Sequence, residues 1–199
     1  MQKMSLELML RGEQQSPLWP DSTLGKIGYF LGTPDRWDFA NESFFSCQLG
    51  YADFEINLQA RDNQVVVTRF WVELWDTPEG EPSPKKTRIR LARGIKVELG
   101  RIQPGLALAD ARTLLDSLGV KFQEFDRNDA SEIVKEFRTA SNAELLFFRG
   151  PDGPVLMEVH FFSADEQQHP FANVGTDTKK AAPRDGLSKG RCGPVREPR

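Results

Sequence analysis

Cysteine and histidine are both scarce in this 199-residue chain, which contains only Cys47, Cys192, His160 and His169. Two distant cysteines cannot form a disulfide framework, and no spacing of cysteine and histidine fits a zinc site. We therefore expect no metal and no cofactor. We interpret Cys47 as a small core residue and His160 as a histidine on a strand surface.

Long apolar runs are also missing. No stretch approaches the roughly 18 residues needed for a membrane-spanning helix. The short apolar run at the N-terminus is interrupted by Glu7 and lacks the features of a signal peptide. The chain has no Gly-x-Ser-x-Gly motif, no Walker motif and no dinucleotide-binding glycine pattern. These absences predict a cytoplasmic, non-enzymatic protein without catalytic residues.

The formal net charge of −3 is unevenly distributed. Residues 164–199 carry seven basic and five acidic side chains, a net charge of +2, so the rest of the chain carries −5. An acidic body argues against binding to nucleic acid or a membrane through that body. It is compatible with a basic protein partner.

Composition divides the chain into four parts. Residues 1–75 and 87–163 are the two parts rich enough in apolar residues to fold, and residues 76–86, "DTPEGEPSPKK", form a Pro-rich linker. Residues 164–199 contain one aromatic residue, Phe171, among many Gly, Pro and charged residues. Such a segment buries too little apolar surface to order itself, which predicts a disordered tail.

The two apolar parts show an internal repeat. With an offset of 87 residues, "STLGKIGYFLG" aligns with "ADARTLLDSLG", and both have the i, i+3, i+4, i+7 apolar stripe of an amphipathic helix ending in Leu-Gly. An alternating stretch precedes each helix, with Leu6, Leu8 and Leu10 in the first copy and Ile95, Val97 and Leu99 in the second. Each copy is therefore interpreted as a strand, a helix and an antiparallel meander.

The meander strands are expected at about 43–49, 53–59 and 65–75, and again at 131–138, 144–148 and 155–162. Residues 131–138 could alternatively form a short helix. Tight turns are predicted at Gly50-Tyr51, Asp62-Asn63 and Asp152-Gly153. The fold class is α+β, with two tandem copies of a strand, a helix and an antiparallel meander, and with the helices packed on one face of the sheet.

Strand alternation assigns the side chains of residues 65–75 to two faces. Val66, Thr68, Phe70, Val72 and Leu74 should face the helix. The other face combines aromatic and charged residues, and such a mixture is typical of an interaction surface. We expect a partner protein to bind to this face. We also expect it to contact the residues that follow the first helix, because the second copy of the repeat has no equivalent of them. The set is Tyr51, Arg69, Trp71, Glu73, Trp75, Asp35, Trp37 and Asp38. In the alternative, the tryptophans cover the linker or pack between the two copies.

The segments "STLGKIGYFLGTPD" and "IQPGLALADARTLLDSLG" carry a resemblance to known proteins. Gly105 and Leu118-Gly119 match the opening and closing of a helix, and Leu31-Gly32 and Pro34 match the closure in the first copy. This layout resembles the small α+β domain of outer-membrane assembly lipoproteins and, duplicated, the β-lactamase inhibitory protein fold. It also looks like cytoplasmic immunity proteins of bacterial toxin systems.

The resemblance implies a non-enzymatic module that binds another protein, such as a basic toxin domain, by steric occlusion through an aromatic-bearing sheet. A structural or self-associating accessory domain is the alternative. The third hypothesis is a small-molecule binder or an enzyme whose site lies at the edge of the sheet that carries Asp35 and Asp38.

Overall fold

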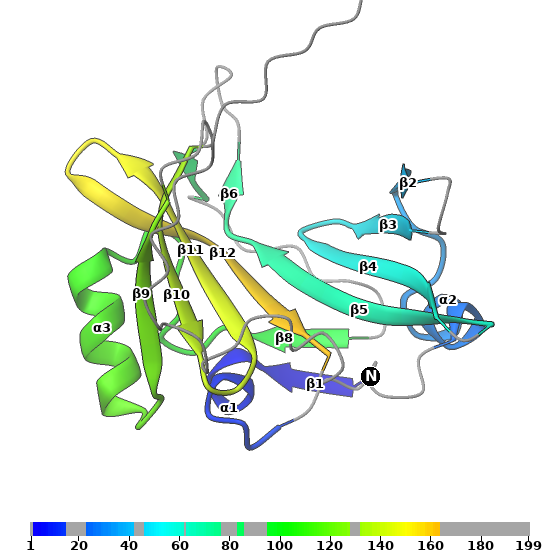
Figure 1. Ribbon diagram of the computed structural model, residues 1–199, viewed down its shortest axis with the longest axis horizontal. Helices are drawn as coiled ribbons and strands as arrows, with labels where there is room; N and C mark the ends of the chain where they lie inside the picture. Colours follow the sequence, from blue (N-terminus) through cyan, green and yellow to red (C-terminus); the bar gives the residue numbers. More distant parts are fainter. Residues whose placement is uncertain are drawn as a thin grey trace, which may run out of the picture.

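The computed structural model describes residues 2–14, 23–41, 46–61, 63–76, 83–85, 95–127 and 132–163. Most of the predicted linker and the whole predicted tail, residues 164–199, lie outside these ranges. The described part is mostly antiparallel sheet with three short helices, which is an α+β architecture (Figure 1).

Eight strands form the main antiparallel sheet, in the order β2-β3-β4-β5-β12-β11-β10-β9. Their bounds are β2 Arg36–Asn41, β3 Ser46–Tyr51, β4 Phe54–Arg61, β5 Gln64–Glu73, β9 Phe122–Asp126, β10 Ile133–Thr139, β11 Ala143–Gly150 and β12 Gly153–Phe162. β5 and β12 pair in the middle, with Trp71 opposite His160 and Phe70 opposite Phe161. The sheet is therefore continuous across the two parts of the sequence.

Two smaller strand pairs accompany this sheet. β1 (Gln2–Ser5) pairs in parallel with β8 (Ile95–Glu98), which brings segments more than 90 residues apart side by side. β6 (Trp75–Asp76) pairs with β7 (Ser83–Pro84). Part of the predicted linker thus carries a short strand pair.

The helices are α1 (Leu6–Leu10), α2 (Leu24–Leu31) and α3 (Leu108–Ser117). The hydroxyl of Thr23 accepts a hydrogen bond from the backbone N–H of Lys26 and caps the start of α2. Gly32, at φ 81°, ends α2, and Gly119, at φ 68°, follows the end of α3. Positive φ is easy for glycine, so the predicted Leu-Gly stops are confirmed.

The strand predicted through Leu6, Leu8 and Leu10 is wrong, because these residues form α1. The hydroxyl of Ser5 caps the helix by accepting the N–H of Leu8, and Met9 is buried together with Leu6 and Leu10. The i, i+3, i+4 spacing of these buried residues is that of a helix. The strand of this segment is β1, which lies immediately before α1.

Each meander has four strands where the sequence predicted three, because β2 and β9 were missed. The alternative helix at 131–138 is not formed, since β10 is a strand paired on both sides. The turn between β4 and β5 has Asn63 at φ 62°, and the turn between β11 and β12 has Gly153 at φ 124°. The predicted hairpins at these two turns are confirmed.

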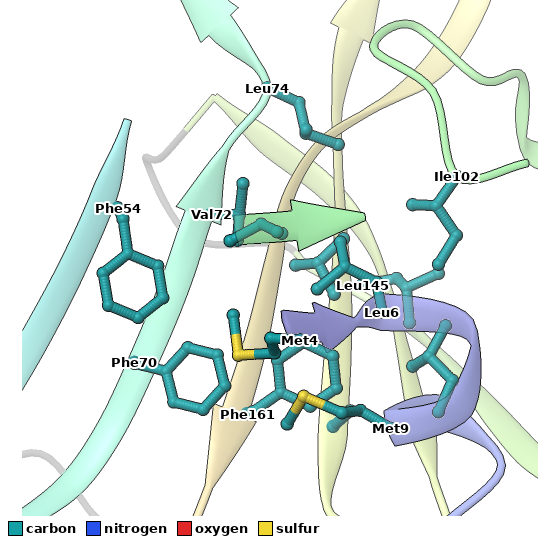
Figure 2. Close-up of a cluster of buried hydrophobic side chains, with 14 of the residues drawn as sticks. Met4, Leu6, Met9, Phe54, Phe70, Val72, Leu74, Ile102, Leu145 and Phe161 are labelled. Atoms are coloured by element: carbon teal, nitrogen blue, oxygen red, sulfur yellow. The ribbon is translucent and has the colours of Figure 1, made fainter. Parts of the chain in front are cut away.

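The larger of the two hydrophobic clusters formed by the described residues lies on one face of the eight-stranded sheet. Phe70 of β5 stacks against Phe161 of β12 with ring centroids 5.2 Å apart, directly across the central junction. Figure 2 shows Met4, Leu6 and Met9 of the N-terminal segment beside these rings. Buried residues of all three helices belong to the same cluster. Cys47 also belongs to it, so its interpretation as a core residue is confirmed.

The predicted side-chain orientations are wrong in two places, at Tyr51 and on β5 around Thr68. Tyr51 lies in the hydrophobic cluster, because the β3–β4 turn falls at residues 52–53 and places Tyr51 opposite Phe54. On β5 the register shifts beside Asn57, so that Val67 faces the core and the Thr68 hydroxyl donates a hydrogen bond to the Asn57 side chain at 2.9 Å. A β-bulge of this kind reverses the alternation on one side of it.

Candidate interaction surface

The face of the eight-stranded sheet opposite the hydrophobic cluster carries polar and charged side chains, and we call it the polar face. One row of residues crosses it through neighbouring register pairs. Its members are Arg138, Glu144, His160, Trp71, Glu55, Gly50 and Arg36. Each lies directly opposite the next, so the row spans seven adjacent strands. The two parts of the sequence therefore share one continuous surface.

At one end of the row, two carboxylates share one guanidinium. Arg36 reaches from β2 across Gly50 to a short contact with Glu55, and its Nη2 lies 3.2 Å from Glu73. A Cβ at Gly50 would overlap the Arg36 side chain, so this position needs glycine for the crossing. Gln48 also donates to the buried Glu55. Of the two carboxylates, Glu73 therefore makes the longer contacts with Arg36.

The pKa of Glu73 is raised to about 7, mainly by burial and to a smaller extent by the neighbouring Glu55 carboxylate. Arg36 has the opposite, weaker effect. The side chain of Glu73 is 16% exposed. Glu73 thus holds a proton over much of the range below neutral pH.

A second carboxyl pair lies toward the other end of the row. Arg138 makes a short contact with Glu136, which is fully buried, and Arg127 contacts the same carboxylate at 2.8 Å. Glu144 lies 3.5 Å from Arg138 Nε. Burial, followed by the Glu136 carboxylate, raises the pKa of Glu144 to about 7. Burial also acts to raise the pKa of Glu136, but its two arginines outweigh burial and lower it.

Aromatic rings occupy the centre of the polar face. Trp71 stacks on His160 with centroids 5.3 Å apart, and the guanidinium of Arg69 lies 4.8 Å from the Trp71 ring centre and 5.9 Å from that of Phe162. Trp71 is buried. Trp71 is therefore not exposed on the surface, and it packs against His160 of the second part of the chain.

His160 is buried at 6% exposure and bonded through one nitrogen only. Its Nε2 lies 2.7 Å from Glu158, which also accepts a hydrogen bond from Trp75 Nε1 at 2.8 Å. Burial lowers the pKa of His160 against the effect of Glu158, so the ring is neutral at pH 7. Nε2 then donates to Glu158, and Nδ1 is a buried acceptor without a hydrogen-bond donor.

The predicted partner-binding residues fall into three groups by exposure. Tyr51 and Trp71 are buried, whereas Arg69, Glu73 and Trp75 are partly buried on or beside the polar face. Asp35, Trp37 and Asp38 are exposed at the edge of the sheet. Trp37 is 64% exposed on β2, which pairs with β3 alone among the described strands.

Asp35 has a structural partner. Its carboxylate accepts the backbone N–H of Ala52 at 2.7 Å, and its own N–H donates to the Gly50 carbonyl at 2.8 Å. These bonds fix the β3–β4 turn, where Ala52 has φ 54°. Asp35 thereby holds a non-glycine residue in a left-handed conformation.

We expect Asp35→Ala to lower the free energy of unfolding by about 1 kcal/mol, because the Ala52 N–H loses its acceptor. Urea unfolding monitored by tryptophan fluorescence measures this change. Ala52→Gly relieves the left-handed strain and should raise stability in the same assay. Equal midpoints for Asp35→Ala and the unaltered chain would show that the turn does not depend on this bond.

Strand alternation placed Glu55, Arg69 and Glu73 on the open face, but sequence reasoning did not single out the charged residues of the second meander. Glu136, Glu144 and Glu158 each stand within an apolar strand segment, as in "KEFRT", "AELLF" and "MEVHF". A glutamate recurring in three apolar strands is a signal that could have been used. Tyr29 was also missed as a surface aromatic, and it is 86% exposed on α2.

Within the described ranges, no group of three or more His, Cys, Asp and Glu side chains is arranged to hold a metal ion. None of the described helices has the length and apolar character required to cross a membrane.

No known protein family matches this chain, and neither a curated protein nor a solved structure matches it. A functional assignment therefore depends on the geometry of the chain itself.

Proposed function

We propose that this chain is a non-enzymatic protein-binding module, acting as an immunity or inhibitor protein that occludes its target sterically. The binding surface consists of the exposed edge strand β2 and the adjoining polar face. Trp37 is the anchor, with Asp38 and Arg36 beside it on the same strand. The module is a tandem of two related units, each with a helix and a four-stranded meander, and the helices cover one face.

The main support for this proposal is the exposure of the Trp37 side chain. A tryptophan that is 64% exposed on an edge strand leaves a large apolar area in water, and tryptophans of this kind often dominate binding energies. An edge strand also offers backbone donors and acceptors to a partner strand. Tyr29 and Leu24 add exposed apolar area on α2, the element that precedes β2.

Two observations support the tandem arrangement. The strand order mirrors itself about the β5–β12 pair, with each meander starting at an edge strand and ending at the centre. A helix with a Leu-Gly end precedes each meander, and buried residues of both helices join the same hydrophobic cluster.

We expect Trp37→Ala to weaken binding to a target protein by about 2 kcal/mol, roughly 30-fold, without changing the free energy of unfolding. The product of the adjacent gene is the target to test, by isothermal titration calorimetry with the full-length chain. Leu8→Ala is the matched control, since Leu8 is a partly exposed apolar residue of α1.

Unchanged affinity in Trp37→Ala would reject the β2 edge as the binding surface. If the chain instead forms stable homo-oligomers that Trp37→Ala disrupts, the edge serves self-association, as in the accessory-domain alternative.

A further inference from the structure

The edge strand β2 has only a short backbone attachment to the rest of the sheet. Within the described ranges it pairs with β3 alone. The register is regular from Arg36, opposite Gly50, to Phe39, opposite Cys47, and it shifts before Asn41. Short strands with a single neighbour open locally at a low cost in free energy. The side chains that tie β2 to other strands therefore decide how firmly this edge is held.

The Arg36 side chain connects β2 to two strands with which β2 does not pair. It passes over Gly50 of β3, and its Nη2 contacts Glu55 of β4. The same nitrogen lies 3.2 and 3.3 Å from the two carboxylate oxygens of Glu73 on β5. One terminal nitrogen, with its two N–H groups, thus serves carboxylates on two strands.

Both carboxylates are more shielded from water than Arg36 itself. The Glu55 side chain is 4% exposed and that of Glu73 is 16% exposed, against 57% for Arg36. Gln48 donates to the other oxygen of Glu55 and fixes its orientation. Ion pairs between fully exposed side chains contribute little to stability. Here the hydrogen bonds are charge-assisted and reach carboxylates in a poorly solvated place, where such bonds are stronger.

Gly50 provides the passage for the Arg36 side chain. A Cβ at Gly50 would overlap Arg36 Cγ and would lie 2.6 Å from Arg36 Nε. Gly50 is not among the described glycines with positive φ, so its backbone conformation accepts alanine. The lack of a side chain at this position is therefore required by the crossing of Arg36 and not by the backbone.

We propose that Arg36 is a positioning residue for the β2 edge. By joining β2 to Glu55 and Glu73, it keeps the strand in the sheet and holds Trp37 in place for a partner. The inference rests on the proposed function, because Trp37 is the anchor of that binding surface. Trp37 directly follows Arg36 and projects from the opposite face of the strand, so its position depends on the backbone that Arg36 holds.

The contribution of Arg36 depends on the charge of Glu73. The charged groups that face Glu73 are Glu55 on β4, Arg36 from β2, and Glu158 directly opposite on β12. Arg36 lowers the pKa of Glu73 against burial and Glu55, which leaves it at about 7. A group that lowers a pKa interacts more favourably with the ionised form. Arg36 therefore holds β2 more firmly when Glu73 is ionised than when it is protonated.

Hydrogen exchange of the full-length chain, followed by mass spectrometry on peptides that cover residues 36–41, measures this attachment without any target. At about pH 8 we expect Arg36→Met to lower the protection factors of the β2 amides at least about tenfold. At about pH 6, where Glu73 is mostly protonated, the loss should be about threefold or less. Arg36→Lys should recover part of the protection. The matched control is Arg11→Met, which removes an arginine paired with Glu13 two residues away and should leave β2 unchanged.

Gly50→Ala tests the same attachment with Arg36 and both carboxylates still in the chain. The added methyl group would displace the Arg36 side chain, so this variant should lose as much β2 protection as Arg36→Met. In the double variant Gly50→Ala/Arg36→Met the overlap is absent, so alanine should cause no further loss. In a Glu73→Gln background, the effect of Arg36→Met should be the same at the two pH values.

Unchanged β2 protection in Arg36→Met at about pH 8 would overturn the proposal, because pairing with β3 would then hold the strand by itself. An equal loss at both pH values in the chain that keeps Glu73 would also overturn it, since the contact with Glu73 would then contribute nothing.

These results are independent of the Trp37 experiment. If Arg36→Met releases β2 but Trp37→Ala leaves the affinity for the target unchanged, Arg36 holds the strand and the edge is not the binding surface.

Discussion

Replacing Lys85 by methionine should lower the free energy of unfolding by about 3 kcal/mol. The Lys85 side chain is 5% exposed, and its Nζ lies 3.1 Å from Asp53 and 2.9 Å from Asp76. Asp53 is itself 2% exposed, in the turn between β3 and β4. Removing one partner of a buried ion pair leaves the other charge in a poorly solvated place, which is strongly destabilising. Chemical denaturation measures the change.

A double variant and a surface control sharpen this test. Asp53→Asn/Lys85→Met removes both charges and should recover part of the loss. Lys96→Met, in an exposed pair with Glu98, should change stability by less than about 0.5 kcal/mol. If Lys85→Met unfolded at the same denaturant concentration as the unaltered chain, the segment at β7 would contribute nothing to the stability of the body.

Replacing Glu73 and Glu144 by glutamine should stabilise the protein at about pH 8, on the order of 2–3 kcal/mol for each site. Both carboxyls have a pKa of about 7 in the folded chain, against an ordinary value of 4.5. The folded state therefore holds protons that the unfolded state has already released. Stability falls as the pH rises from about 4.5 through 7, and glutamine removes that loss.

The difference should disappear at about pH 4, where both carboxyls are protonated in either state. Thermal unfolding of both variants across this pH range provides the comparison. Glu136 and Glu158 have lowered pKa values because hydrogen bonds from their partners outweigh burial. Protonation of these two carboxylates at acidic pH therefore destabilises the variants and the unaltered chain equally. A variant that gained nothing at pH 8 would show that these carboxyls ionise without cost.

The local signals in the sequence were sufficient for much of the secondary structure. The helix ends at Gly32 and Gly119 and the turn at Gly153 follow from residues that accept positive φ. The short apolar segment at Leu6–Leu10 was ambiguous, because its Leu-x-Leu-x-Leu alternation hides a helical pattern completed by Met9. A helix of five residues offers too few periods to distinguish the two.

The orientation of side chains was predicted less well, because it depends on where turns and bulges fall. A shift of the β3–β4 turn by two residues moved Tyr51 into the core, and one bulge at Thr68 exchanged the faces of its neighbours. Alternation has a period of two, so a single additional residue reverses every assignment beyond it.

The polar face could not be assembled from the sequence, because its contacts join residues far apart in the chain. Glu158 and Trp75 are separated by 83 positions, and His160 meets Trp71 across the central junction. Only the pairing of β5 with β12 brings these side chains together. Strand alternation correctly placed Trp71 on the polar face, but alternation contains no information about its burial beside Arg69 and His160.

The pairings of β1 with β8 and of β5 with β12 also set the order in which the molecule can form. Each joins segments that lie far apart in the sequence, and both halves of the main sheet depend on the central pair. Closing such long loops costs entropy before any contact is gained, which slows folding. During synthesis, β5 remains an open sheet edge until β12 has been made. The emerging first half is therefore the stage at which this chain is most exposed to aggregation.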